Sequence, residues 1–264
     1  TPEDMKATID RTQAAFPAWT ATPVTERANS LRKLADALEA NRDELIAICV
    51  KEAGKTVGDS VAEVREAVDF CRYYAARAEE MFSATHQATP PQSRGVVLCI
   101  SPWNFPLAIF LGQVSAAVVA GNTVVAKPAE QTSLIAVRAI ELWREVGLPA
   151  GVVELVIAPG RSVGEHVVPD LRVQAVMFTG STETGSWIAR KLAERGGEPV
   201  PLIAETGGQN CMIVDSTALP EQVVDDVVSS GFQSAGQRCS ALRVLFLQED
   251  VADKIITMIK GAMQ

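Results

Sequence analysis

The stretch Gly95-Val96-Val97-Leu98-Cys99-Ile100 is a glycine followed by a short apolar run rich in β-branched residues, which is typical of a buried strand. Similar runs recur along the chain, separated by amphipathic stretches of helical length. Gly121 and Gly147 lie where the C-terminal ends of two such helices are expected. The expected strands are 96–100, 123–126, 152–156, 175–178 and 201–204. Strands alternating with helices predict an α/β fold with a doubly wound, mostly parallel five-stranded sheet.

The residues before this series, 1–82, have helical patterns only. Thr1-Pro2 and Thr22-Pro23 are N-cap and first-turn signals, and a third helix is expected at about 57–81. The helical spacing of the second helix is carried by Leu31, Leu34, Ala35 and Leu38. Residues 85–94, which include Pro90-Pro91, predict an irregular surface loop.

A second, weaker series follows the fifth strand. It comprises strands at 211–214 and 244–247 and helices at 220–234 and 250–263. Two strands and two helices make a poor independent core, because small units bury little surface. We therefore expect two domains, 1–207 and 208–264, of which the second is the incomplete beginning of another α/β domain.

The composition is that of a globular protein. Of the 264 residues 47% are hydrophobic and 21% are charged, which excludes a disordered or fibrous chain. The net charge of −8 and the absence of clustered Lys and Arg argue against a nucleic-acid partner. The apolar stretch 105–120 is interrupted by Gly112, Gln113 and Ser115, so no membrane span is expected.

Five cysteines lie far apart and never in C-x-x-C spacing, which favours reduced thiols in a cytoplasmic protein over a disulfide framework. With only two histidines, no metal site is expected. Four cysteines lie in apolar helices or strands and are expected to be buried and inert, namely Cys49, Cys71, Cys99 and Cys211. Cys239 differs, because it lies in Gly236-Gln237-Arg238-Cys239-Ser240-Ala241 among small and polar residues, where Arg238 could favour the thiolate. Cys239 is therefore the candidate nucleophile.

Two further polar residues follow expected strands. Glu205 precedes Thr206-Gly207-Gly208 at the end of the fifth strand, where ligands collect in doubly wound sheets. It is a candidate general base, and the alternative is a solvated turn carboxylate. Asn104 follows the first strand, and its amide could donate to a developing alkoxide or cap the next helix.

A third feature suits a phosphate-bearing ligand. Gly180 and Gly185 flank an expected strand-to-helix junction, where backbone N–H groups and the helix dipole can meet a pyrophosphate. The spacing is neither the G-x-G-x-x-G fingerprint nor a P-loop. Lys127 and Glu130 follow the second strand, and the alternative for them is an exposed i,i+3 ion pair.

Taken together, these motifs closely resemble the aldehyde dehydrogenase superfamily. The resemblance covers the chain and rests on Pro102-Trp103-Asn104-Phe105-Pro106, Lys127-Pro128-Ala129-Glu130, Gly180-Ser181-Thr182-Glu183-Thr184-Gly185, Ile203-Ala204-Glu205-Thr206-Gly207-Gly208 and the Cys239 motif. It implies a Rossmann-like sheet of the aldehyde dehydrogenase type, NAD as cofactor and an aldehyde as substrate. The first domain then binds NAD and the second is catalytic.

The resemblance also implies a role for each motif residue. Cys239 attacks the aldehyde, Glu205 activates the water that hydrolyses the thioester, and Asn104 with the Cys239 N–H stabilises the oxyanion. Lys127 and Glu130 bind the adenosine ribose, and a carboxylate there favours NAD over NADP by repelling a 2′-phosphate. The full set of implied cofactor contacts is Ile100, Ser101, Pro102, Trp103, Lys127, Glu130, Gly180, Ser181, Gly185, Thr206 and Gly207.

The sequence at 99–110, 126–132 and 204–210 is similar to that of one branch of the superfamily, the aldehyde dehydrogenase part of bifunctional proline utilization proteins. This implies oxidation of L-glutamate γ-semialdehyde to L-glutamate, and is compatible with a proline dehydrogenase domain as partner and with a homo-oligomer. The family's catalytic domain continues beyond its nucleophile, so we expect this chain to be a fragment. The alternative function is a nucleotide-binding module without turnover. A cysteine hydrolase lacks support, because His86 and His166 lie in no recognisable base motif.

Overall fold

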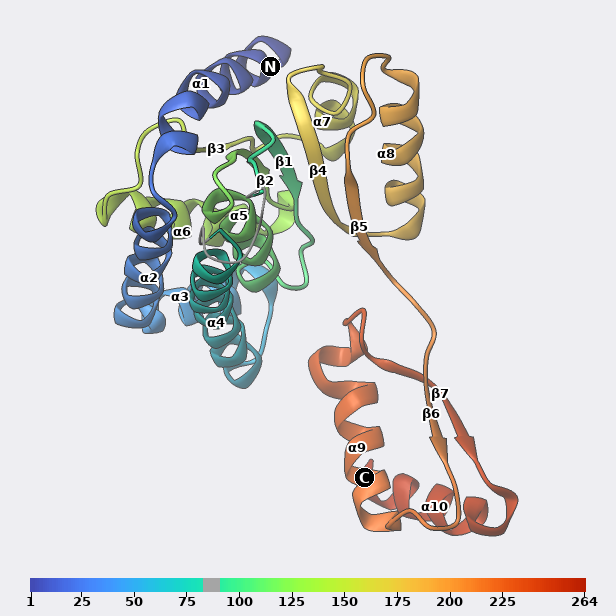
Figure 1. The fold of residues 1–264 in the computed structure, drawn as a ribbon. Helices are drawn as coiled ribbons and strands as arrows, with labels where there is room; N and C mark the ends of the chain where they lie inside the picture. The colour runs from blue at the N-terminus through green and yellow to red at the C-terminus, as the bar shows by residue number, and fades with distance from the viewer. Residues whose placement is uncertain (83–90) are drawn as a thin grey trace. The chain divides into compact units, whose positions relative to one another are not determined.

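The computed structural model describes residues 1–82 and 91–264, and these form two compact units, Thr1–Glu205 and Thr206–Gln264 (Figure 1). We describe each unit by itself. Most of the loop expected at 85–94 lies outside the described residues, and 91–94 have no regular secondary structure. The domain division expected after residue 207 stays a prediction.

Four helices begin the first unit: α1 (Pro2–Ala21), α2 (Val24–Ala40), α3 (Arg42–Ala53) and α4 (Val57–Phe82). The Thr1 hydroxyl caps α1 as expected, by accepting a hydrogen bond from the Asp4 N–H. The expectation for Thr22 is wrong, because Pro23 is the N-cap of α2 and has no capping side chain. The helix expected at about 57–81 is the fourth helix and not the third. A separate helix, α3, precedes it and ends at Gly54, which has the left-handed conformation (φ 64°).

The predicted five-stranded sheet is confirmed. Its strands are β1 (Val96–Ile100), β2 (Thr123–Lys127), β3 (Val153–Leu155), β4 (Val173–Gly180) and β5 (Leu202–Thr206), in the spatial order β3-β2-β1-β4-β5. β1 pairs in parallel with β2 and β4, and β2 pairs in parallel with β3. The order reverses between β1 and β4, which is where open α/β sheets bind ligands at the carboxyl ends of the strands.

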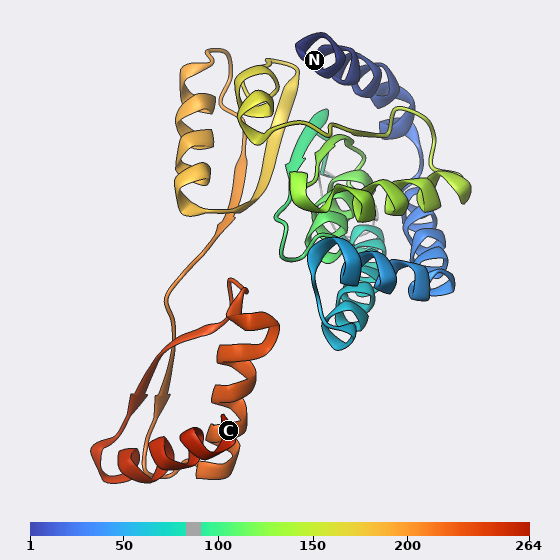
Figure 2. The same ribbon diagram turned by 180° about the vertical axis from the view of Figure 1, so that it is seen from behind.

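Helices cover both faces of this sheet, as Figures 1 and 2 show from opposite sides. The linking helices are α5 (Ala108–Val119), α6 (Ser133–Glu145), α7 (Gly160–His166) and α8 (Thr182–Glu194). Val97 and Cys99 of β1 pack in a core with α2 to α6, whereas Val96 and Leu98 pack with α1, α7 and α8. Because side chains alternate along a strand, an apolar run without alternation is what a sheet covered on both faces requires.

Two glycines end helices where the sequence predicts them. Gly121 (φ 90°) and Gly147 (φ 106°) follow α5 and α6, each one residue beyond the C-cap. A side chain is strained at such φ angles, so glycine lets the chain turn sharply into β2 and toward β3.

The second unit contains β6 (Asn210–Val214), α9 (Pro220–Phe232), a 3₁₀ turn η2 (Gln233–Gly236), β7 (Leu242–Leu247) and α10 (Glu249–Ala262). β6 and β7 pair in parallel. The core of this unit is small and is formed by Val214, Val223, Val227 and Ile255. In the part of the chain that the structure describes, no helix is both long and apolar enough to cross a membrane.

Candidate functional site

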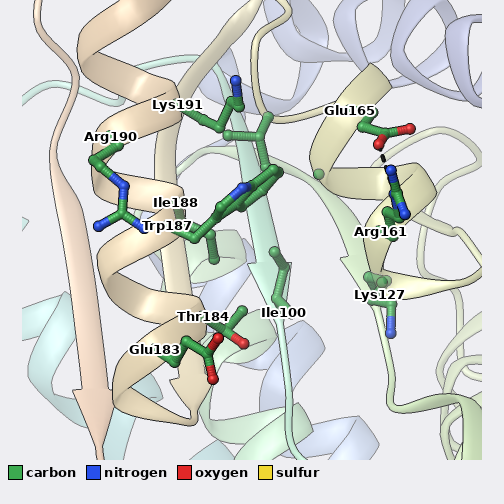
Figure 3. Close-up of a pocket in the computed structure, with 13 residues that line it drawn as sticks. Ile100, Lys127, Arg161, Glu165, Glu183, Thr184, Trp187, Ile188, Arg190 and Lys191 are labelled. Atoms are coloured by element: carbon green, nitrogen blue, oxygen red, sulfur yellow. Dashed lines mark hydrogen bonds and ion pairs between the residues drawn. The ribbon is translucent and has the colours of Figure 1, made fainter.

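A pocket of about 660 Å³ opens at the carboxyl ends of β1 and β2, between α7 and α8 of the first unit (Figure 3). β1 and β2 contribute Ile100 and Lys127 to it. The other lining residues come from α7, from the residue two positions after it and from α8: Gly160, Arg161, Gly164, Glu165, Val168, Glu183, Thr184, Trp187, Ile188, Arg190 and Lys191. Its place at the ends of parallel strands is that of a ligand site in a doubly wound sheet.

Lys127 lines the polar corner of the pocket, and Glu130 lies next to Lys127 and Gly160. Lys127 Nζ lies 3.9 Å from Glu130 Oε1, and the same oxygen accepts a hydrogen bond of 2.6 Å from the Gly160 N–H. The Lys127 side chain is only 7% exposed, and burial lowers its pKa. The pair differs from an exposed i,i+3 ion pair, because the ammonium group is buried against the pocket while the carboxylate is half exposed.

The apolar wall of the pocket depends on a glycine. Trp187 and Ile188 of α8 face α7 across the pocket (Figure 3). A Cβ atom at Gly164 would lie 2.5 Å from the Trp187 ring, so only glycine lets the indole lie this close to α7. A flat aromatic wall next to a buried ammonium group and a carboxylate could hold a nucleoside, with its base on the indole and its hydroxyls on the polar corner.

The junction expected between a strand and a helix is observed. Gly180 ends β4, and the Ser181 side chain caps α8 by accepting a hydrogen bond from the Thr184 N–H. Gly185 is buried in the first turn of α8. Glu183 and Thr184, between these glycines, line the pocket. The N-terminus of α8 therefore lies beside the pocket, where its dipole favours a negatively charged group.

The other cofactor candidates lie near the end of β1 or outside the first unit. Ser101 is buried, and its hydroxyl has no hydrogen-bond partner among the described residues. Pro102 and the exposed Trp103 follow it in the chain without lining the pocket. Thr206 and Gly207 belong to the second unit.

Asn104 lies half-buried in the loop between β1 and α5. It is not the cap of the following helix, because α5 begins four residues later and its N-cap is Leu107. The first N–H groups of α5 are bound instead by the carboxylate of Glu63, which accepts from Leu107 and Ala108 at 2.9 Å each. The backbone carbonyl of Asn104 accepts a hydrogen bond of 2.8 Å from Lys55 Nζ.

Cys239 is exposed on a loop of the second unit whose backbone is fixed by side chains. Asn210 Nδ2 donates to the carbonyl oxygens of Cys239 (2.6 Å) and Ala241 (3.0 Å). Arg243 Nη2 donates to the Gly236 carbonyl at 2.6 Å. Arg238 donates to the carbonyls of Ser229 and Ser230 in the last turn of α9, so its charge is engaged there.

The turn before this loop has a rare backbone conformation. Ser234 (φ 54°) and Ala235 (φ 53°) are both left-handed, as is Gly236 (φ 66°). A Cβ atom at Gly236 would lie 2.7 Å from the Gly231 carbonyl oxygen, so the chain passes close to α9 here. Left-handed non-glycine residues each cost on the order of 1 kcal/mol, and such strain clusters at functional sites.

The sequence predicts that the other four cysteines are buried, and this holds for three of them. Cys49, Cys71 and Cys99 are buried, and burial raises the pKa of the Cys49 and Cys71 thiols to about 12 and that of Cys99 as well. The expectation that Cys211 is buried is wrong, because its side chain is exposed. It lies in β6, where Val214 joins the core with α9 and α10 while Cys211 and Ile213 stay exposed.

Glu205 is the second-last residue of β5, and its side chain is exposed. It belongs to the first unit with Asn104, whereas Cys239 belongs to the second. The catalytic roles of these three residues therefore stay predictions. His166 Nδ1 contacts the Ser162 carbonyl oxygen within α7, and His86 lies outside the described residues. In residues 1–82 and 91–264, no cluster of His, Cys, Asp and Glu could hold a metal ion.

Four residues of these sites are absent from the sequence-based prediction. Trp187 could have been suspected from its place on the helix after the fourth strand, and Asn210 from its place directly after the Glu205 motif. Lys55 and Glu63 gave no signal, because charged residues near a helix are usually solvated.

Comparison with known proteins agrees with this architecture. The model of the "Aldehyde dehydrogenase family" matches residues 1–264. The chain is 52% identical to the bifunctional protein PutA of Escherichia coli strain K12 over 267 residues, which are 100% of this chain and 20% of that protein. A structure of proline utilization A with proline bound in remote sites superposes with a TM-score of 0.95 at 52% identity, covering 99% of this chain and 28% of the other.

A second solved structure is 1-pyrroline-5-carboxylate dehydrogenase from Thermus with bound NAD. It superposes with a TM-score of 0.94 at 32% identity, covering 98% of this chain and 53% of that one. The chain thus spans a fifth of the curated relative and about half of the shorter dehydrogenase. Since the family model matches the whole chain and the fold agrees, the chain belongs to the aldehyde dehydrogenase family.

Proposed function

We propose that this chain supplies the NAD site, nucleophile, base and oxyanion donor for oxidation of L-glutamate γ-semialdehyde to L-glutamate. The observation that carries the proposal is that Cys239 is an exposed thiol on a loop whose backbone is held by the side chains of Asn210 and Arg243. The buried thiols of Cys49, Cys71 and Cys99 lack both access and thiolate character. The substrate rests on the similarity to PutA and to 1-pyrroline-5-carboxylate dehydrogenase.

The residues around the pocket fit NAD. Trp187 and Ile188 offer a surface for the adenine, and Lys127 with Glu130 offers a donor and an acceptor for ribose hydroxyls. The N-terminus of α8, with Ser181 as its cap, suits the pyrophosphate. The buried Ser101 hydroxyl, which has no partner among the described residues, offers a further polar group at the end of β1.

In the proposed reaction the Cys239 thiolate attacks the aldehyde carbon, forming a C–S bond and a tetrahedral oxyanion. The Asn104 amide and the Cys239 N–H donate hydrogen bonds to that oxygen. When bound, NAD supplies the two-electron acceptor for the hydride that leaves this carbon. Glu205 then takes a proton from water, the hydroxide attacks the thioester, and the carboxylic acid forms as the Cys239 thiolate leaves.

Two related proposals follow from the same comparisons. We propose a proline dehydrogenase domain as the partner that supplies the substrate, which the bifunctional nature of the PutA relatives supports. A cytoplasmic location and a homo-oligomeric state stay predictions.

The test is NADH formation by the protein at its natural length, with Δ1-pyrroline-5-carboxylate as source of the semialdehyde. NAD binding should be measured in parallel by calorimetry. We expect both binding and turnover. Binding without turnover would favour the alternative, a nucleotide-binding module, and absence of both would contradict the proposed cofactor.

A further inference from the structure

A buried ion pair lies beside the loop that carries Asn104. Lys55 Nζ is 3.0 Å from Glu63 Oε2, and the two side chains are 6% and 0% exposed. Lys55 follows the left-handed Gly54 that ends α3, and Glu63 lies in α4. Burying two charges is costly unless their remaining hydrogen-bonding groups find partners, so the partners of this pair indicate its role.

Both members of the pair bind the loop between β1 and α5. Lys55 Nζ donates a hydrogen bond of 2.8 Å to the Asn104 carbonyl oxygen and lies 4.6 Å from the centroid of the Phe105 ring. Glu63 Oε1 accepts from the backbone N–H groups of Leu107 and Ala108. One ion pair thus holds the loop at its middle, where Lys55 binds Asn104, and at its end, where Glu63 binds Leu107 and Ala108.

We infer that Lys55 and Glu63 are positioning residues that fix the Asn104 backbone and thereby aim its side-chain amide at the oxyanion. The inference rests on the proposed function, in which Asn104 is the side-chain donor. An oxyanion donor is effective only when it is held in place before the reaction, and a misplacement of about 1 Å can cost about 100-fold in rate. Lys55 and Glu63 act through Asn104 and do not themselves touch the reacting atoms.

Arg27 provides a matched control for a purely structural role. It is also a buried cation, 5% exposed, and its Nε donates a hydrogen bond of 2.9 Å to the carbonyl of Val119 at the other end of α5. Arg27→Met removes a buried cation that binds the C-terminal end of α5, and it should leave the Asn104 loop unchanged. If Lys55 only stabilised the fold, Lys55→Met and Arg27→Met would affect activity alike.

The experiment is a double-mutant cycle of Lys55→Met and Asn104→Ala in the natural-length protein, with Δ1-pyrroline-5-carboxylate and NAD. We expect Lys55→Met to lower kcat and kcat/KM together by about 10- to 100-fold while KM and NAD affinity change less than about twofold. In the Asn104→Ala background, the same change should cost less than about twofold, because the donor it positions is absent. Arg27→Met should lower the Tm and leave kcat within about twofold.

Glu63→Gln gives a second, milder variant, because it keeps the shape of the side chain and removes its charge. We expect it to lower kcat in the same cycle even if Lys55→Met does not fold. The inference would be overturned if the substitution at position 55 or 63 lowered kcat as much in the Asn104→Ala background as in the parent. It would also be overturned if Arg27→Met lowered kcat as much as Lys55→Met does. If the unsubstituted protein formed no NADH from the aldehyde, the proposed function would fail, and the inference with it.

Discussion

The side-chain amide of Asn210 donates a hydrogen bond of 2.6 Å to the backbone carbonyl oxygen of Cys239. The same nitrogen donates to the Ala241 carbonyl at 3.0 Å, so one side chain fixes the carbonyl groups of the two residues that flank Ser240. A nucleophile whose backbone is fixed in this way meets its substrate in one orientation, which removes an entropic cost from the reaction.

Replacing Asn210 by Ala should therefore impair catalysis more than stability. We expect Asn210→Ala to lower kcat by about tenfold or more, because the loop can then move. The free energy of unfolding should fall by only about 1 kcal/mol. Steady-state NADH formation and chemical denaturation measure the two effects.

Gln248→Ala is the control, because the Gln248 side chain accepts from the Ser216 N–H and donates to Asp250, both in the same unit. It should lower stability similarly and leave kcat unchanged. Equal kcat values in the two variants would show that Asn210 is only structural.

Thiol reactivity in the folded protein should separate the five cysteines. With a pKa of about 12, Cys49 and Cys71 are ionised to only about one part in ten thousand at about pH 8, and burial also denies access to them and to Cys99. Raising the pH should therefore not label them before the protein unfolds. We expect iodoacetamide to modify Cys239 first and the exposed Cys211 more slowly, as followed by mass spectrometry of peptides. Early labelling of Cys49 or Cys71 would contradict their burial.

The sheet could be predicted from sequence because each strand is a short apolar run of its own. Val96–Ile100 is apolar at every position, and this is what a strand covered on both faces requires. The division between α2 and α3 was missed, because only the non-helical backbone of Asn41 (φ −108°, ψ 19°) separates these two helices, and a helical pattern of apolar residues does not reveal it. The exposure of Cys211 was missed because it depends on which face of β6 the helices of the second unit cover.

The cofactor preference should depend on Glu130. Its carboxylate is held by the Gly160 N–H beside the pocket, where it would repel a 2′-phosphate. We expect Glu130→Ala to narrow the preference for NAD over NADP by about tenfold, as measured from the ratio of the two kcat/KM values. Glu165→Ala, which removes a carboxylate that lines the pocket, is the control and should change this ratio less. An unchanged ratio in Glu130→Ala would remove Glu130 from the ribose site.

Glu205 should act after the first chemical step. Because a general base is needed to activate water, Glu205→Gln should give an initial burst of NADH followed by a slow steady state. Stopped-flow absorbance measures both phases. Glu198→Gln, which changes an exposed carboxylate earlier in the same unit, should keep the parental steady state. Loss of the burst itself would show that Glu205 serves thiol activation or folding.

The sequence yields candidate site residues only where one motif carries the chemistry. Cys239, Glu205 and Asn104 stand out because small or apolar residues surround a single reactive group. Lys55 and Glu63 could not be found in this way, since their partners lie more than 40 residues further along the chain. Trp187 likewise becomes part of a pocket only because Gly164 of another helix leaves room for its ring.

The most direct test of the account compares two exposed thiols in the natural-length protein, through Cys239→Ala and Cys211→Ala. NADH formation from Δ1-pyrroline-5-carboxylate and NAD affinity are measured for both variants and the parent. The account predicts that Cys239→Ala loses at least about a thousandfold in kcat and binds NAD as the parent does, because the thiol forms the covalent bond and the cofactor pocket lies in the first unit. Cys211→Ala should retain parental kcat. Turnover by Cys239→Ala near the parental rate would contradict the assignment of Cys239 as the nucleophile.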